Sequence, residues 1–335
     1  MEKRRLGKTD LMVTVVGLGG IPLQRLSEDE AGLIVKSAVE AGINFIDTAR
    51  GYTVSEEYIG SALEKYNLHD QVHLATKTMV RDYEGMKKEI ETSLANLKTD
   101  YIDLYQAHLI KTEDQYEQFI NGGYRALVEA KEAGKIGAIG ITAHTASLLE
   151  KLLDPEKFDT IQFPYNPIES QGERLFRLAK EHDMGVICMK PIAGGAFHRG
   201  DLSIKFILQN ENVTVAIPGM DTLEQVQTNT AIGKNLVALT EEEAQEVEAI
   251  VKELGSEFCR RCGYCLPCQQ GIDIPTNILF EGYFKRYDMK DWAVGRYNKL
   301  AKNASDCVEC GVCESRCPYD LPIRKMLKSV AETFE

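Results

Sequence analysis

Eight short apolar runs recur along residues 1–255, and each is followed by a longer amphipathic segment. The runs have the length of strands, and the segments between them have the apolar spacing typical of helices. Eight βα units in about 250 residues predict a (β/α)₈ TIM barrel. The predicted strands begin at Val15, Asn44, Val72, Tyr101, Ile136, Thr160, Gly185 and Val213.

A doubly wound open sheet is the alternative fold, because it also alternates strands and helices. Its dinucleotide-binding form has a Gly-rich turn directly after the first strand. The run Val16–Gly20 contains three glycines but is not followed by the spacing of that turn. We therefore expect the closed barrel.

Cysteine content and charge both change near Gly255. Eight of the nine cysteines follow Ser256. Residues 257–335 contain 12 basic and 11 acidic residues, whereas the whole chain has a net charge of −12. This change predicts a barrel domain at 1–255 and a small second domain at 256–335.

Composition also excludes several classes of protein. The chain has 39 basic and 51 acidic residues, and such an excess of negative charge disfavours nucleic acid as a partner. The longest mostly apolar stretch, Leu11–Leu23, is too short to span a membrane. The charged start of the chain has no signal-peptide character. We expect a cytoplasmic protein.

Four polar residues are predicted at the carboxyl ends of neighbouring barrel strands, where TIM barrels carry their active sites. Asp47 follows the second strand and Tyr52 lies in the next loop, while Lys77 and His108 end the third and fourth strands. A lysine ammonium beside the Tyr52 hydroxyl would stabilise its anion. Asp47 would hold Lys77 charged, and a neutral His108 could donate to a carbonyl oxygen. Together these residues could protonate a carbonyl oxygen while hydride reaches its carbon.

The second domain contains two runs of four cysteines. The later run follows the spacing C-x₂-C-x₂-C-x₃-C-P of bacterial ferredoxins, which bind [4Fe–4S] clusters. The earlier run has a last gap one residue shorter, and Gln269 follows it instead of proline. The spacing predicts a ferredoxin-like domain with two clusters, and the aromatic residues at helical intervals in 275–302 predict that it is mainly helical.

In two-cluster ferredoxins the fourth cysteine of each run binds the cluster of the other run. By this rule one cluster is bound by Cys259, Cys262, Cys265 and Cys317, and the other by Cys307, Cys310, Cys313 and Cys268. The shortened gap leaves the assignment of Cys268 open. Zinc is the alternative, because two C-x₂-C pairs can form a tetrahedral site. A third evenly spaced cysteine in each run and Pro318 favour the clusters.

The strings FIDTARGY, LATK and LYQAH resemble the aldo-keto reductase family, and the resemblance extends to about residue 235. Together with the cysteine runs, the chain resembles the branch of that family that carries a ferredoxin-like domain. The resemblance implies a catalytic tetrad. In it, Tyr52 is the general acid, Lys77 and Asp47 adjust the pKa of Tyr52, and His108 directs the carbonyl.

The resemblance also implies a nicotinamide cofactor site. Gln162 and Thr142 match positions that bind the carboxamide, Met189 replaces the stacking aromatic residue, and Lys190 lies where the pyrophosphate is contacted. Gln225 and Asn229 resemble the adenosine-binding segment. Gly219 and Gln225 occupy the positions of the lysine and arginine that bind a 2′-phosphate in relatives. The resemblance therefore argues against a preference for NADPH, and it leaves NADH and flavin open.

Three functions remain open from the sequence. The first is an NAD(P)H-dependent reductase of small carbonyl compounds, which we favour. The second is an electron-transfer oxidoreductase in which the clusters relay electrons between a redox partner protein and the barrel, with flavin as the converter, because hydride carries two electrons and each cluster exchanges one. The third is a redox-sensing protein that binds a nucleotide without turnover.

Overall fold

The structure is a computed structural model that describes residues 1–334, and it divides into two compact units. The first unit comprises Met1–Asn166, Ser170–Pro191 and Arg199–Leu239. The second comprises Pro167–Glu169, Ile192–His198 and the chain from Thr240 onward. The second unit therefore includes the helix α10 (Glu241–Gly255), which precedes the expected domain boundary, so the boundary at residues 255 and 256 stays a prediction.

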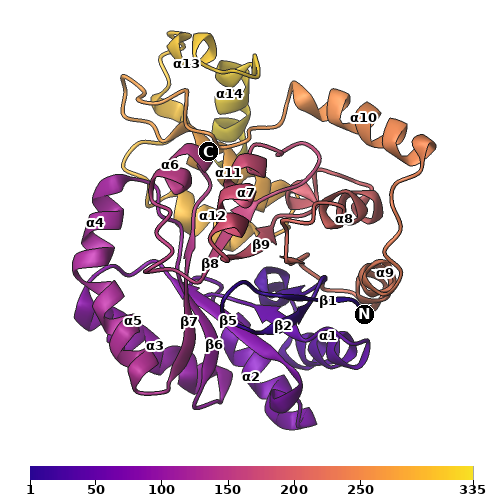
Figure 1. Ribbon diagram of the computed structural model, residues 1–335. Helices are drawn as coiled ribbons and strands as arrows, with labels where there is room; N and C mark the ends of the chain where they lie inside the picture. The colour runs from indigo at the N-terminus through magenta and orange to yellow at the C-terminus, as the bar shows by residue number, and fades with distance from the viewer. Residues whose placement is uncertain (335) are drawn as a thin grey trace. The chain divides into compact units, whose positions relative to one another are not determined.

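The first unit contains an eight-stranded parallel sheet whose strands are neighbours in chain order. Parallel bridges from Val16 to Ala216 and from Gly19 to Gly219 join its two edges, so the sheet closes into a barrel. Figure 1 shows the middle strands β5 to β8 running side by side. The predicted fold and all eight predicted strands are confirmed. The strands are β3 (Leu18–Gly19), β4 (Phe45–Asp47), β5 (His73–Thr78), β6 (Ile102–Ala107), β7 (Ile136–Thr142), β8 (Thr160–Pro164), β9 (Gly185–Met189) and β10 (Val215–Ala216).

Helices connect the strands, and local sequence fixes where they begin. The Ser27 hydroxyl accepts from the backbone N–H of Glu30 at 3.4 Å, and the Glu30 carboxylate accepts from the backbone N–H of Ser27 at 2.9 Å. This capping box starts the first α-helix. The α-helices of this unit are α1 (Glu28–Glu40), α2 (Ser55–Tyr66), α3 (Tyr83–Leu97), α4 (Glu113–Asn121), α5 (Gly123–Glu132), α6 (Ala146–Lys151), α7 (Glu173–Glu181), α8 (Gly200–Leu208) and α9 (Leu223–Lys234).

The barrel has an inner and an outer layer of apolar side chains, because alternate residues of a strand point to opposite faces. On β4, Phe45 belongs to the inner cluster and Ile46 to the outer cluster, which packs against the helices. The inner cluster comprises Leu6, Val13, Phe45, Ala75, Leu104, Ala138, Ile187, Val215 and Ile217.

A hairpin that the sequence analysis did not predict contributes two residues to the inner cluster. It consists of β1 (Lys3–Arg5) and β2 (Met12–Thr14), which pair antiparallel. Gly7 in its loop forms a bridge with Met184, next to the start of β9. The hairpin therefore lies at the amino ends of the strands, opposite the carboxyl ends where barrel active sites form.

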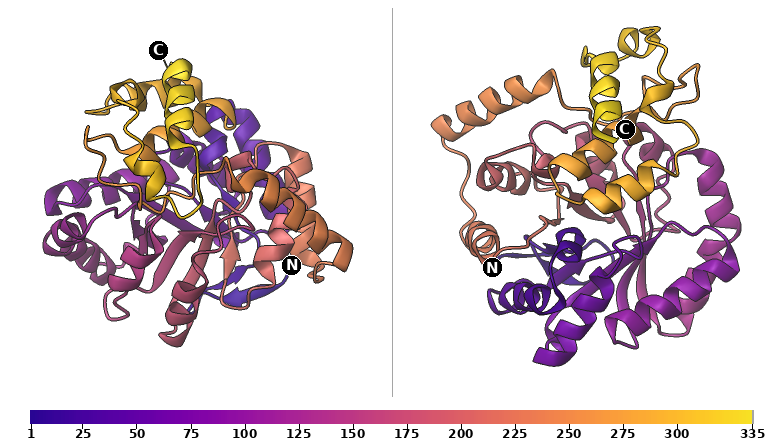
Figure 2. Two further views of the ribbon diagram at one scale, coloured as in Figure 1. Left: turned by 90° about the horizontal axis from the view of Figure 1, so that it is seen from above. Right: turned by 180° about the vertical axis from the view of Figure 1, so that it is seen from behind.

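The second unit is helical, and it has a hydrophobic core of its own. α11 packs against α12 and α14, and Figure 2 shows these orange and yellow helices gathered together. Tyr297 stacks on Phe334 with ring centroids 4.2 Å apart. Within the described residues the unit contains no strand, so the predicted mainly helical character is confirmed. Its helices after α10 are α11 (Ile274–Lys285), α12 (Lys290–Tyr297), α13 (Val312–Ser315) and α14 (Ile323–Phe334).

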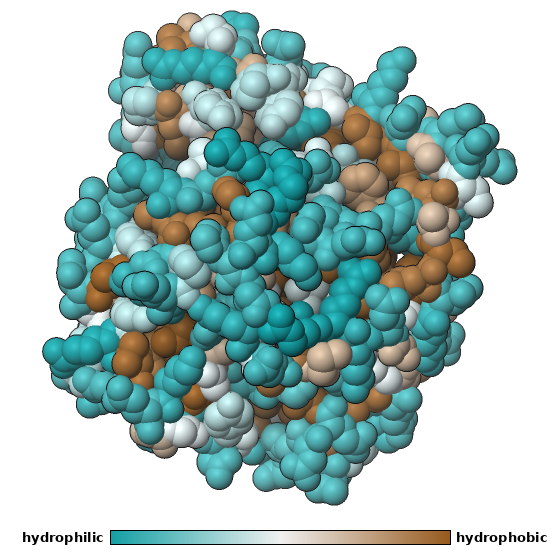
Figure 3. Space-filling view, viewed as in Figure 1, coloured by the Kyte–Doolittle hydropathy of each residue, from teal (hydrophilic) through white to brown (hydrophobic). Residues whose placement is uncertain are grey.

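Among residues 1–334, no helix combines the length and the apolar character needed to cross a bilayer. On the face seen in Figure 3, hydrophilic residues cover most of the surface, and the hydrophobic residues form small separate patches. The expected cytoplasmic location stays a prediction.

Candidate functional site

Polar side chains continue the inner face of the barrel towards the carboxyl ends of β4, β5 and β6. On these strands the inner cluster contains Phe45, Ala75 and Leu104. Two residues further along each strand, on the same face, lie Asp47, Lys77 and Gln106. The period of the strands therefore places three polar groups inside the barrel, and all three are buried.

Asp47 and Lys77 form a buried ion pair. The Lys77 ammonium donates to Asp47 Oδ1 at 2.6 Å and to the backbone carbonyl of Thr48 at 2.7 Å. The amide of Gln106 donates to the other carboxylate oxygen at 3.3 Å. Burial raises the pKa of Asp47 and lowers the pKa of Lys77, and the attraction within the pair opposes both shifts. These hydrogen bonds compensate for the removal of two charges from water.

Tyr52 and His108 lie beside this ion pair. The Lys77 ammonium is 5.1 Å from the centroid of the Tyr52 ring. The rings of Tyr52 and His108 meet edge to face, with centroids 6.0 Å apart and an interplanar angle of 89°. The structure therefore brings together the four residues that the sequence suggested as catalytic.

Arg81 holds the backbone next to His108, and the sequence analysis missed it. Its guanidinium donates to the carbonyl of Thr78 at 3.3 Å, to the carbonyl of Leu109 at 3.2 Å and to the carbonyl of His108. Burial lowers the pKa of Arg81 to about 10. An arginine in a loop carries no local signal that it reaches the end of the next strand. Gln106 was also missed, although the two-residue period of a strand places it on the same face as Leu104.

Thr142 and Gln162 lie opposite each other on β7 and β8. The Thr142 hydroxyl accepts from the backbone N–H of Leu109 at 2.7 Å. Gln162 is 1% exposed, and its side chain lies close enough to Asp47 to oppose the rise that burial causes in the pKa of that carboxyl. Within residues 1–334 the Oε1 atom of Gln162 has no hydrogen-bond partner. A buried amide oxygen without a donor costs roughly 1–3 kcal/mol, which indicates a place for a donor from a ligand.

Met189 and Lys190 follow each other at the end of β9. Met189 is partly buried, and its side chain packs against the inner cluster. Lys190 adopts a left-handed backbone with φ of 54°, and its carbonyl accepts from the Asn166 amide at 3.0 Å. This bond holds a conformation that residues other than glycine rarely adopt.

Two of the three remaining predicted cofactor residues, Gly219 and Gln225, have structural roles. A Cβ atom on Gly219 would lie 2.5 Å from Cγ of Pro22, so this position has no space for a side chain unless Pro22 moves. The Gln225 carboxamide completes a capping box with Thr222 and also accepts from the backbone N–H of Asp221 at 2.8 Å. Asn229 is buried on α9. The structure does not bring Gln225 or Asn229 into a measured contact with the buried ion pair.

The cysteines of the second unit gather in two overlapping groups. Burial raises the pKa of Cys259 to about 11, and the Cys262 thiol lies close enough to add to this rise. The Cys317 thiol is close enough to Cys262 to add to the rise that burial causes in the pKa of Cys262. Both pairs fall within the first predicted ligand set. The other group lines one cavity and consists of Cys265, Cys268, Cys307, Cys310 and Cys313.

This cavity therefore contains all four cysteines of the second predicted ligand set, including Cys268. Cys265, from the first set, also lies against it. Thiols are the ligands that iron–sulfur clusters take, so the residues present fit such a group. Among residues 1–334 no group of three or more Cys, His, Asp or Glu side chains is arranged to hold one metal ion. A cubane does not need that arrangement, because each thiolate binds a different iron.

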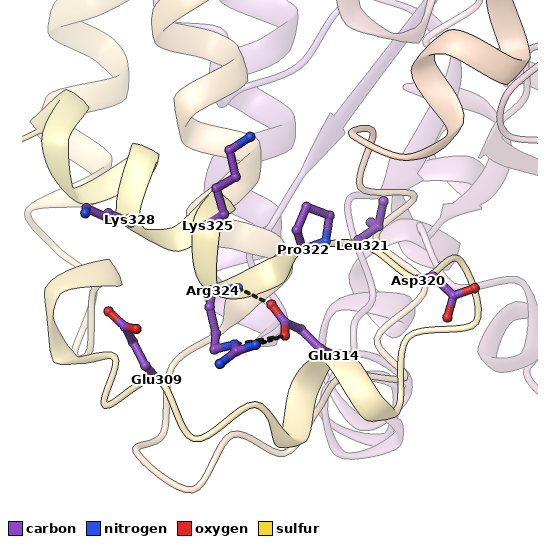
Figure 4. Close-up of a pocket in the computed structure, with 8 residues that line it drawn as sticks. All are labelled: Glu309, Glu314, Asp320, Leu321, Pro322, Arg324, Lys325 and Lys328. Carbon is purple, nitrogen blue, oxygen red and sulfur yellow. Dashed lines mark hydrogen bonds and ion pairs between the residues drawn. The ribbon is translucent and has the colours of Figure 1, made fainter.

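A groove of about 590 Å³ adjoins the helices α13 and α14. Figure 4 shows Arg324 paired with Glu314 in this groove, with the two groups 2.8 Å apart. Its lining contains as many acidic as basic side chains, so its charge selects no particular ligand. The lining residues are Glu309, Glu314, Asp320, Leu321, Pro322, Arg324, Lys325 and Lys328.

Residues 15–203 match the pattern of the aldo/keto reductase family, which is more than half of the chain. The chain belongs to this family. Residues 258–322 match a 4Fe-4S dicluster domain. Both parts of the resemblance seen in the sequence are therefore confirmed, and the protein is an aldo-keto reductase-type oxidoreductase with a 4Fe-4S domain.

Individual relatives cover about three-quarters of the chain. An uncharacterised oxidoreductase, YqkF from Bacillus subtilis, is 27% identical over 306 residues, covering 76% of this chain and 97% of the relative. L-galactose dehydrogenase from Arabidopsis thaliana is 28% identical over 303 residues, covering 75% and 95%. Among solved structures, the holo form of the aldo-keto reductase AKR11C1 from Bacillus halodurans superposes with a TM-score of 0.64 at 26% identity, covering 75% of this chain and 96% of that one.

Proposed function

We propose that the protein reduces the carbonyl group of a small molecule with a nicotinamide cofactor, and that Tyr52 is the general acid. The observation that carries this proposal is the Lys77 ammonium, held by Asp47 at 2.6 Å and lying 5.1 Å from the Tyr52 ring. When the Tyr52 hydroxyl gives its proton to the carbonyl oxygen, a negative charge forms on the phenol. A fixed cation stabilises that charge without having to reorganise during the reaction.

His108 and Arg81 would set the direction of the proton transfer. The rings of His108 and Tyr52 are in edge-to-face contact, with centroids 6.0 Å apart, so we expect the imidazole to reach a carbonyl oxygen that accepts from Tyr52. Arg81 holds the backbone of His108 through its carbonyl. A second donor at the carbonyl oxygen orients the substrate and excludes other approaches.

The residues that would hold the nicotinamide ring are Gln162, Thr142 and Met189. When bound, the nicotinamide supplies the hydride. The unpartnered Gln162 Oε1 would accept from its carboxamide, and Met189 would pack against the ring. Lys190 would contact the pyrophosphate through its charge. Gly219 has no side chain and Gln225 carries an uncharged amide, which caps a helix, so neither supplies a cation for a 2′-phosphate. We therefore expect NADH to serve at least as well as NADPH.

The two clusters would be bound by the cysteine sets that the spacing predicts.

A second function rests on the cluster of the set that contains Cys310. Cys310 is exposed, and its neighbour Val308 is 61% exposed, so one electron could enter or leave at this edge of the cavity. In that case the protein is an electron-transfer oxidoreductase, and a flavin would convert between one-electron and two-electron steps.

The test is anaerobic turnover of holoprotein with NADH or NADPH and a panel of aldehydes and ketones. The panel includes methylglyoxal, because a relative described as methylglyoxal reductase DkgA from Yersinia pestis is 35% identical over 136 residues. The variant Tyr52→Phe should lose roughly 10²–10⁴-fold in kcat/KM. Tyr58→Phe, a partly buried tyrosine of α2, is the control and should keep full activity.

Three results would overturn the proposal. Equal activity of the wild type and Tyr52→Phe would remove Tyr52 from the reaction. No turnover by the wild type despite tight binding of a nucleotide would favour the redox-sensing protein. Activity that needs a flavin and a reduced protein partner would favour electron transfer.

A further inference from the structure

Two arginines separate the first two cysteines of the earlier run, which reads C-R-R-C over residues 259–262. Arg261 is one of the few charged residues of the second unit that is buried, with 9% of its surface exposed. It adopts a left-handed backbone with φ of 56°, so the chain turns sharply between the two cysteines. Burial of a guanidinium is costly unless its donors find acceptors.

Two of the three nitrogens of Arg261 have acceptors. Nη2 forms an ion pair with the carboxylate of Glu169, which is fully buried in the same unit. Nη1 donates to the backbone carbonyl of Cys259 at 3.3 Å. Among the described residues, Nε is buried and has no hydrogen-bond partner. A native protein rarely leaves such a donor unsatisfied, so the unpartnered Nε of Arg261 indicates an acceptor that the polypeptide does not supply.

The position of Arg261 limits what that acceptor can be. It lies between Cys259 and Cys262, both in the first predicted ligand set, and its charge acts on the Cys259 thiol. Sulfides and thiolates of an iron–sulfur cluster are anionic acceptors. The ion pair with Glu169 keeps the guanidinium from turning away towards solvent.

We propose that Arg261 donates through Nε to the cluster of Cys259, Cys262, Cys265 and Cys317 and raises its reduction potential, and that Glu169 limits this effect. The inference rests on the ligand assignment in the proposed function. Reduction adds one electron to the cluster and neither forms nor breaks a bond. A buried cation stabilises the added negative charge, and the Glu169 carboxylate partly cancels that cation. Hydrogen bonds to cluster sulfurs are a known determinant of such potentials.

The proposal predicts opposite shifts for two variants. Arg261→Gln removes the cation but keeps an amide donor, so the ratio of oxidised to reduced cluster at the wild-type midpoint should rise about tenfold. For a one-electron couple this lowers the midpoint by about 59 mV. Glu169→Gln leaves Arg261 charged without its counter-ion, so the midpoint should rise. A role limited to packing would not produce shifts of opposite sign.

The experiment is an anaerobic titration of the full-length holoprotein with dithionite, followed by electron paramagnetic resonance, with iron and sulfide assays on every sample. Arg316→Gln is the matched control, because Arg316 adjoins the ligand Cys317 but is exposed, and water screens its charge. The cluster of the second ligand set, present in the same molecules, is an internal reference. Both should keep the wild-type midpoint.

An unchanged or higher midpoint in Arg261→Gln, with its iron retained, would overturn the proposal. So would shifts of the same sign in Arg261→Gln and Glu169→Gln. If Arg261→Gln loses its iron, Glu169→Gln decides alone, and an unchanged midpoint there also overturns it. If the wild type contains iron for only one cluster, the ligand assignment itself is wrong, and the inference falls with it.

Discussion

The polar centre of the barrel and the cysteine region of the second unit differ in what holds their side chains. In the barrel, Asp47 and the Thr48 carbonyl fix the Lys77 ammonium within 2.7 Å through bonds of the polypeptide alone. The cysteines of the second unit are free thiols among the described residues, and burial raises the pKa of Cys265 to about 12. Such thiols become thiolates when a metal binds and displaces their protons. The comparison indicates that the fold alone holds the proposed catalytic centre in place. We expect the cysteine region, in contrast, to take its final form only when iron binds.

Removal of iron should have the largest effect, and it should affect only one region. Anaerobic chelation should abolish hydrogen-exchange protection in α11, α12 and α14, because Cys265 and Cys313 are part of the core of that small unit. Amides of β4 to β8 should stay protected. The measurement is exchange followed by mass spectrometry. Full protection of α11 to α14 after complete loss of iron would break the comparison, because the second unit would then be held by its apolar core alone.

Removal of the Lys77 charge tests the barrel side of the comparison. Lys77→Met should lower kcat/KM by roughly 10²–10⁴-fold, because the tyrosinate loses its stabilising cation. It should also lower the free energy of unfolding by roughly 3–5 kcal/mol, since Asp47 is left buried without a counter-charge. The double variant Asp47→Asn, Lys77→Met should recover most of this stability and none of the activity. Recovery of both would show that the pair only supports the fold.

Replacement of Arg81 tests how much of the preorganisation comes from the backbone beside His108. Arg81→Gln should lower kcat/KM by about tenfold, because hydrogen bonds from a charged donor contribute roughly 1.5–3 kcal/mol. The exposed Arg125→Gln is its control and should leave kcat/KM unchanged. Steady-state kinetics measures both. An active Arg81→Gln would mean that other contacts suffice to hold His108.

Gln225 should show the smallest effect, and it separates a structural from a cofactor role. Gln225→Ala should cost about 0.5–1 kcal/mol of stability through loss of the capping box on α9, with the KM for NADH unchanged. Gln227→Ala, on the exposed side of the same helix, should change neither quantity. Chemical denaturation and cofactor titration give the two values. A raised KM with unchanged stability would assign Gln225 to the cofactor instead.

The sequence predicted what is periodic or local, and it missed what depends on distant contacts. Alternation of apolar runs predicted the eight strands, and strand ends predicted Asp47, Lys77 and His108. The pairing of Arg261 with Glu169 spans 92 residues and leaves no local pattern. The short strand Lys3–Arg5 was missed because it is polar and mostly exposed, so it lacks the apolar run by which the other strands were found. From the sequence, Gly219 showed only that the cation of relatives is absent at this position. The structure adds that Pro22 leaves no space there for a side chain.

The central claim is that the barrel reduces its substrate by direct hydride transfer with a proton from Tyr52, without using the clusters. The most direct measurement uses NADH carrying deuterium at the transferred position and follows the label by mass spectrometry of the alcohol product. We predict that the deuterium is retained on the former carbonyl carbon in the wild type and that Tyr52→Phe forms almost no product. Loss of the label to water, with product still formed, would contradict the account and favour a route through flavin and the clusters.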